Sequence, residues 1–166
     1  MDTEQNSNRR FGGIERLYGT PAWHKLQQAH VTVVGVGGVG SWVVEALARS
    51  GVGHITLIDL DNVAESNVNR QLPAITPLFG MPKVDALQQR VFDINPACKV
   101  TTIEDFVDED NIATLFAERV DFVVDAIDQV RVKAAMAAWF VRHKQPFVVS
   151  GAAGGQRHPE HIRVAD

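Results

Sequence analysis

The stretch VTVVGVGGVG, residues 31–40, decides which fold we expect for this chain of 166 residues. Its first four residues predict a short apolar strand, and a helix is predicted to follow at about residues 39–50. Glycines at such a junction let the backbone turn tightly and approach a phosphate, which the amide groups and dipole of the helix N-terminus favour. A tight turn without a ligand would contain the same glycines, but the flanking strand and helix favour nucleotide binding. The glycines that we assign to this nucleotide-binding turn are Gly35, Gly37, Gly38 and Gly40.

Short apolar strands alternate with helices along the rest of the chain. Further strands are predicted at residues 55–58, 99–103, 121–126 and 147–150. Further helices are predicted at residues 83–93, 110–118 and 130–143. Because parallel strands need crossover connections, and these cover both faces of a sheet, the alternation predicts an α/β fold with a doubly wound, mostly parallel, Rossmann-like sheet.

The length of the chain fits one domain. Residues 1–9 are polar and are predicted to be a disordered lead-in to a domain at residues 10–166. That domain is expected to begin with a helical preface, at residues 14–18 and 22–29. Residues 162–164 are predicted to start another strand, so we expect the domain to lack its C-terminal portion.

Composition excludes several classes of protein. The formal net charge of −4 argues against nonspecific nucleic-acid binding by the whole domain. No apolar run is long enough for a transmembrane segment, and the polar start does not resemble a signal peptide, so we expect a cytoplasmic protein. Cys98 is the only cysteine, which excludes an internal disulfide framework, and we interpret it as a core residue without a catalytic role. The tryptophans, interpreted as packing residues, are Trp23, Trp42 and Trp139.

Acidic residues follow the second predicted strand. Asp59 lies near the position, about twenty residues beyond the glycine turn, at which a carboxylate hydrogen-bonds ribose hydroxyls. A carboxylate there also argues against a ligand with a 2′-phosphate. Asp61 could share this role or cap the following turn, and the residues alone leave both interpretations open.

The long loop after this strand supplies amides and a cation. Its sequence NVNRQ contains Asn67, Arg70 and Gln71, and Lys83 begins the next predicted helix. Taken singly, Arg70 and Lys83 are more often solvated surface charges. Two cations that converge on a phosphate site suit ATP better than a dinucleotide, because they stabilise charge that builds on the phosphates as pyrophosphate leaves.

The sequence DAID, residues 125–128, follows the fourth predicted strand on the ligand side of the sheet. Mg²⁺ in proteins binds one or two carboxylates together with phosphate oxygens and water. We favour Asp128 over Asp125 as the magnesium ligand, although Asp128 could also cap the helix that begins near Val130.

Together these motifs resemble the ThiF/MoeB/HesA family, the bacterial relatives of ubiquitin-activating enzymes. The matching pieces, in family order, are GVGGVG (35–40), DLD (59–61), NVNRQ (67–71), PK (82–83), INP (94–96), DAID (125–128) and SGAA (150–153). The resemblance covers nearly the whole chain from Arg10 and implies an enzyme that adenylates a carboxylate and releases pyrophosphate. The contacts it implies are ATP at Gly37 and Asp59, phosphate at Arg70 and Lys83, a polar contact at Asn67 and magnesium at Asp128.

Within the family, three stretches are similar to the branch that dehydrates threonylcarbamoyladenosine in tRNA. They are RFGGIERLYG (10–19), GSWVVEALARSG (40–51) and GAAGGQ (151–156). In that branch ATP activates the carboxylate of the modified nucleoside in tRNA, and cyclisation expels AMP. The resemblance thus implies catalytic roles for Arg70, Lys83 and Asp128, a tRNA substrate and a homodimer.

Two alternatives remain at this point. One is an adenylyltransferase for a ubiquitin-like sulfur carrier, with a sulfur-carrier or sulfur-transfer protein as partner. Those enzymes supply an arginine to the partner subunit's ATP from an RYxRQ motif, which the RFGG at residues 10–13 breaks, and Arg16 could substitute for that arginine. The other is a nicotinamide-dependent dehydrogenase or a noncatalytic nucleotide module, which would not need two cations and a magnesium ligand.

Overall fold

A five-stranded parallel sheet forms the centre of the computed structural model, which describes residues 3–151, 155 and 157–165. All four neighbouring pairs of strands are parallel, in the order β3-β2-β1-β4-β5. The strands are β1 (His30–Val34), β2 (His54–Ile58), β3 (Lys99–Ile103), β4 (Phe122–Asp125) and β5 (Phe147–Val149). This confirms the predicted doubly wound α/β fold. The strand order reverses between β1 and β4, and ligands of such sheets bind beside this switch point, at the carboxyl ends of the strands.

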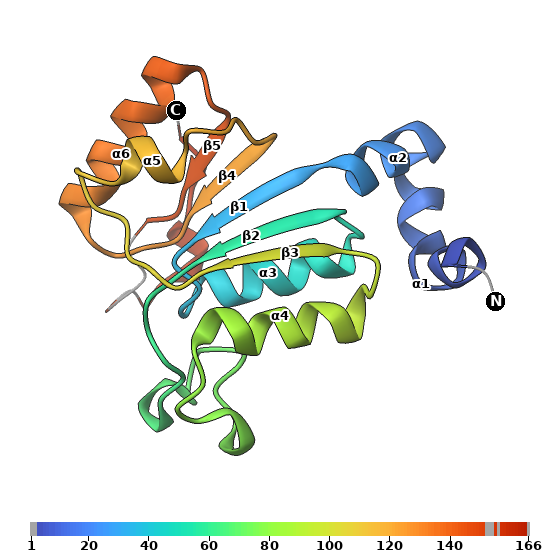
Figure 1. The fold of residues 1–166 in the computed structure, drawn as a ribbon, viewed down its shortest axis with the longest axis horizontal. Coiled ribbons are helices and arrows are strands. Elements are labelled where there is room, and N and C mark those ends of the chain that lie inside the picture. Colours follow the sequence, from blue (N-terminus) through green and yellow to red (C-terminus); the bar gives the residue numbers. More distant parts are fainter. Residues whose placement is uncertain (1–2, 152–154, 156, 166) are drawn as a thin grey trace.

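Helices cover both faces of the sheet (Figure 1). One face packs against α3 (Gly40–Arg49) and α4 (Lys83–Ile94), and the other packs against α5 (Ile112–Leu115) and α6 (Val130–His143). Adjacent residues of β1 serve the two layers, because successive side chains of a strand point to opposite faces. Val33 belongs to the cluster with α3 and α4, whereas Val34 belongs to the cluster with α5 and α6.

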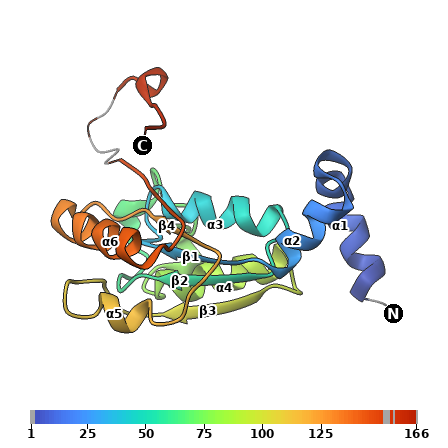
Figure 2. The ribbon, with the colours of Figure 1, turned by 90° about the horizontal axis from the view of Figure 1, so that it is seen from above.

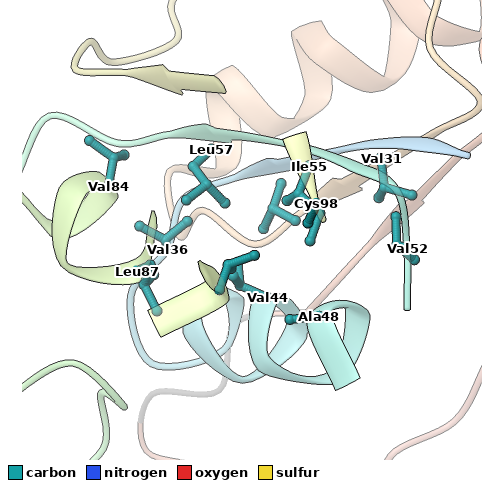
Figure 3. Packing of buried hydrophobic residues seen from close by; sticks show 12 residues of the cluster. Val31, Val36, Val44, Ala48, Val52, Ile55, Leu57, Val84, Leu87 and Cys98 are labelled. Atoms are coloured by element: carbon teal, nitrogen blue, oxygen red, sulfur yellow. The ribbon is translucent and has the colours of Figure 1, made fainter. Parts of the chain in front are cut away.

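The cluster under α3 and α4 consists almost entirely of aliphatic side chains (Figure 3). Leu57 of β2 and Val44 of α3 are both fully buried in it, as is Leu87 of α4. Burying each such side chain contributes about 1.5–3 kcal/mol. This packing places the N-termini of α3 and α4 at the carboxyl edge of the sheet.

The helical preface consists of α1 (Thr3–Tyr18) and α2 (Thr20–Gln28), which lie at the opposite end of the sheet from the switch point (Figures 1 and 2). Phe11 and Trp23 are buried, with ring centroids 5.4 Å apart. Arg10 Nη1 donates hydrogen bonds of 3.0 and 2.8 Å to the carbonyls of Asp93 and Ile94. These carbonyls end α4, where a cation is favourable.

Three predicted segments differ markedly from the structure. Helix α1 begins at Thr3, so residues 3–9, predicted as part of a disordered lead-in, are helical, and that segment contains no Pro or Gly to break a helix. Helix α5 is shorter than predicted. No strand forms at residues 162–164: Ile162 and Val164 are 81% and 99% exposed in a segment that lies away from the sheet, where no strand pairs with it (Figure 2).

Parts of two predicted motifs, SGAA and GAAGGQ, lie outside the described residues. Within the part of the chain that the structure describes, no helix has the length and apolar character needed to span a membrane.

Candidate functional site

A pocket of about 850 Å³ lies at the carboxyl edge of the sheet. It gathers residues that are far apart in the sequence, because β1, β2 and β4 all end at this edge. The predicted site residues that line it are Gly35, Gly37, Gly38, Asp59, Asp61, Asn67, Arg70, Gln71, Lys83 and Asp128. Of the residues assigned to the glycine turn, Gly40 alone does not line the pocket.

The glycine turn is too tightly packed to accept side chains at its two ends. Gly35 has a φ of 77°, and a Cβ there would lie 2.8 Å from Ile127 Cγ2. A Cβ on Gly40 would lie 1.8 Å from the carbonyl oxygen of Gly35. Gly40 thus closes the turn against its own start, while Gly37 and Gly38 face the pocket. Helix α3 follows directly, and the amides of a helix N-terminus favour an anion.

Asp59 joins the end of β2 to the glycine turn. Its Oδ2 accepts a 2.8 Å hydrogen bond from the backbone N–H of Val36, and its Oδ1 accepts one of 2.9 Å from Asp61. These bonds fix the orientation of the carboxylate on the pocket wall. Its contact with ribose hydroxyls stays a prediction.

Asp61 holds Lys83 in the lining of the pocket. The Nζ of Lys83 lies 2.7 Å from Asp61 Oδ2, and its backbone N–H donates to the carbonyl of Asp61 at 2.9 Å. The Lys83 side chain is 6% exposed, whereas that of Asp61 is 73% exposed. Lys83 is therefore not the solvated surface charge that exposure statistics favour. Its ammonium group has three donors, so one ion pair leaves capacity for an anion.

The loop between β2 and α4 brings amides and a guanidinium to the glycines. Asn67 is buried and accepts a 3.0 Å hydrogen bond from Ala64 N–H, which shapes the short 3₁₀ turn Glu65–Asn67. The aliphatic part of Arg70 lies against Gly38, since a Cβ on that glycine would be 3.5 Å from Arg70 Cγ. The Nε2 of Gln71 lies at a similar distance, 3.6 Å, from a Cβ built on Gly37.

The two carboxylates of the DAID sequence have different environments. Asp125 is fully buried, 2.8 Å from Lys133 Nζ, and accepts a 3.1 Å hydrogen bond from Ile127 N–H. Asp128 is exposed and lines the pocket. This arrangement leaves Asp128 free to bind a ligand, whereas Asp125 serves the fold. No cluster of three or more His, Cys, Asp or Glu that could hold a metal occurs among the described residues, so a Mg²⁺ ion at Asp128 would need phosphate and water oxygens.

Sequence reasoning missed several residues of the pocket. Asp105, Phe106, Val107 and Gln129 belong to no motif that we recognised, whereas Leu60, Ser150 and Gly151 lie within the DLD and SGAA motifs but were not assigned to the site. Leu60 and Phe106 are 48% and 52% exposed, and they give the β2–β3 side of the pocket apolar surface. Their position immediately beyond the ends of these strands was the available signal.

Three residues considered from the sequence lie outside the pocket lining. A Cβ on Gly12 would be 3.5 Å from Arg16 Nη1, so Arg16 folds back along its own helix. Cys98 belongs to the aliphatic core, and burial raises the pKa of its thiol to about 11, as expected of a residue without a catalytic role. Trp42, interpreted as a packing residue, is 56% exposed at the start of α3.

Comparisons with known proteins show the family and the fold of this chain. The ThiF family model matches residues 12–160. The tRNA threonylcarbamoyladenosine dehydratase of Haemophilus influenzae is 48% identical over 161 residues, which cover 97% of this chain and 62% of that protein. The crystal structure of the Escherichia coli tRNA N6-threonylcarbamoyladenosine dehydratase in complex with ATP has a TM-score of 0.93 and 49% identity, over 96% of this chain and 65% of that one.

A more distant relative represents the alternative function. The molybdopterin-synthase adenylyltransferase of Escherichia coli is 38% identical over 128 residues, which cover 77% of this chain and 51% of that protein. This chain spans about three fifths of the length of the curated dehydratase that it matches.

Proposed function

We propose that the pocket of this chain binds ATP and serves the adenylation of a carboxylate. The premise is that the chain belongs to the ThiF family. The observation that carries the proposal is the convergence of the glycine turn with Arg70, Lys83 and Asp128 on one pocket. The acceptor that we propose is threonylcarbamoyladenosine in tRNA, because the chain is more similar to the dehydratase than to the adenylyltransferase, 48% against 38%.

The strand order suggests how ATP would lie in the pocket. The apolar residues Leu60 and Phe106 follow β2 and β3, which suits the adenine base on that side. Asp59 would then meet the ribose, and the phosphates would extend across Gly37 and Gly38 toward the cations. The carboxylate would approach from the side of β4 and β5, which Ser150 lines.

The chemistry needs positive charge where the phosphates react. An acceptor carboxylate oxygen attacks the α-phosphorus, and the bond to pyrophosphate breaks. Arg70 and Lys83 would stabilise the negative charge that builds on the phosphate oxygens. The residue suited to hold Mg²⁺ is Asp128, and the ion would neutralise phosphate charge when bound. A nucleophilic atom of the same nucleoside then attacks the activated carbonyl carbon, and AMP leaves, so that the nucleoside loses one water overall.

We further propose a cytoplasmic homodimer, as the resemblance to the family implies. A sulfur-carrier or sulfur-transfer partner belongs to the alternative function, which the divergent RFGG sequence at residues 10–13 does not support.

The experiment that tests this function uses tRNA that carries threonylcarbamoyladenosine. The protein is incubated with this tRNA, ATP and Mg²⁺, and the nucleoside is analysed by mass spectrometry. Loss of one water with stoichiometric AMP is expected, and Asp128→Asn should abolish it. A matched control is Glu118→Gln, an exposed carboxylate beside the amino end of β4 that should have no effect. Pyrophosphate exchange stimulated by a sulfur-carrier protein, without loss of water, would support the alternative.

A further inference from the structure

The first turn of α3 contacts the loop that carries Arg70 at two points. Ser41 Oγ accepts a 3.2 Å hydrogen bond from the backbone N–H of Leu72. The indole Nε1 of Trp42 donates a 3.0 Å hydrogen bond to the backbone carbonyl of Arg70. Since both residues follow Gly40 directly, one helical turn joins the glycine turn to this loop.

The two contacts differ in burial and therefore in what they can contribute. Ser41 is fully buried, and a buried hydroxyl needs a hydrogen-bond partner. Trp42 is 56% exposed, so its ring gains less from burial than the core residue Trp23, which is 6% exposed. The contribution of Trp42 to this contact is therefore the hydrogen bond from its indole N–H to the loop.

Together these bonds hold the backbone on both sides of Gln71. The carbonyl of Arg70 belongs to the peptide group before this residue and the N–H of Leu72 to the peptide group after it, so neither peptide group can rotate without losing a bond. Gln71 and Arg70 are the residues whose side chains lie over Gly37 and Gly38, respectively.

We propose that Ser41 and Trp42 are positioning residues that hold Arg70 and Gln71 over the glycine turn, where Arg70 meets the outer phosphates of ATP. They act through the loop and contribute no group to the reaction. The consequence for ligand binding rests on the proposed function, whereas the effect on the loop does not. Loss of either bond leaves the glycine turn in place but lets the loop carrying Arg70 move away from it.

The test compares nucleotides that differ only in their outer phosphates. Trp42→Phe keeps an aromatic ring but removes the N–H donor, and the exposure of this site keeps the fold intact. One hydrogen bond contributes about 0.5–1.5 kcal/mol, so we expect the affinity for Mg·ATP to fall about two- to tenfold and that for AMP to change less than twofold. Ser41→Ala should act in the same direction. Both affinities are measured by titration calorimetry.

Trp139→Phe is the matched control, because Trp139 lies on α6 against Phe116 and Phe140 and does not line the pocket. It should leave the ratio of ATP to AMP affinity unchanged. An equal loss for ATP and AMP in Trp42→Phe, or no loss for either, would overturn the proposal.

Amide hydrogen exchange without nucleotide separates this inference from the proposed function. Peptides that cover residues 67–72 should exchange faster in Trp42→Phe than in the wild type, while peptides from β1 should not change. If the wild type fails to bind ATP, the proposed function is wrong, and faster exchange in this loop would still support the positioning role. Unchanged exchange would overturn that role.

Discussion

Substitution of Lys133 by Met tests how the buried ion pair between Asp125 and Lys133 contributes to stability. Asp125 is completely buried at the end of β4, and the Lys133 side chain is 14% exposed, with a nitrogen–oxygen distance of 2.8 Å. Lys133 lies in the first turn of α6, where the helix dipole disfavours a cation. The Asp125 carboxylate therefore stabilises the positive charge of Lys133, which the dipole of α6 would otherwise destabilise. In return, the Lys133 ammonium group stabilises a carboxylate that has no access to water.

Lys133→Met keeps the length of the side chain but leaves Asp125 without a cation. Removing one partner of a buried ion pair costs about 3–5 kcal/mol. We expect the lower end, about 3 kcal/mol, because Lys133 is close to the surface and Ile127 still donates to the carboxylate. With a denaturant dependence of about 2 kcal/mol per molar urea, the unfolding midpoint should fall by about 1.5 M. The measurement is urea unfolding at pH 7, followed by circular dichroism.

Two further variants make this expectation specific. The double variant Asp125→Asn with Lys133→Met should recover most of the lost stability, because no buried charge remains. Arg131→Gln on the same helix breaks an exposed pair with Glu109 and should not shift the midpoint measurably. A Lys133→Met midpoint equal to that of the wild type, or a double variant no more stable than the single one, would refute the reasoning.

Two other substitutions probe the glycine turn and the far end of the sheet. Gly40→Ala places a methyl group against the Gly35 carbonyl. It should lower the free energy of unfolding, measured with urea, by about 2–3 kcal/mol and should also weaken the binding of ATP. Full retention of both stability and ATP affinity would contradict the packing described. Burial, reinforced by repulsion from the charges of His30 and Lys99, lowers the pKa of His54 from 6.5 to about 4. The unfolded chain thus binds the proton first, so stability should fall by about 1 kcal/mol, after allowance for solvent screening, as pH drops from 6.5 to 4. Urea unfolding of the wild type and of His54→Gln is measured across this pH range, and the free energy of unfolding should depend less on pH in the variant. Parallel curves of this free energy against pH would exclude His54 as the source.

The sequence predicted those elements whose patterns are bounded by clear local signals. Helix α4 begins at Lys83 directly after Pro82, and both α6 and β3 have the predicted bounds. A strand depends also on a partner that the local pattern does not reveal. Residues 162–164 alternate like a strand, yet they pair with nothing in the described part of the chain.

The site could be predicted where a motif or a strand end carried the information. Asp59 and Asp128 each follow a strand, and parallel strands bring their carboxyl ends to one edge. The ion pair between Asp61 and Lys83 depends instead on how the long loop returns to α4, which no spacing rule describes. Phe106 lines the pocket only because β3 lies beside β2, and this order emerges from packing.

The dissociation constant of Mg·ATP for the wild type and for Arg70→Ala tests the central claim most directly. Arg70 is exposed, so its removal should leave the fold intact. The control is Arg142→Ala, which removes an exposed arginine from the last turn of α6. A hydrogen bond to a charged group contributes about 1.5–3 kcal/mol, which predicts that wild-type protein binds ATP and that Arg70→Ala binds it at least about tenfold more weakly. Equal affinities of the wild type and Arg70→Ala, or no binding of ATP by the wild type, would contradict the assignment of this pocket to ATP.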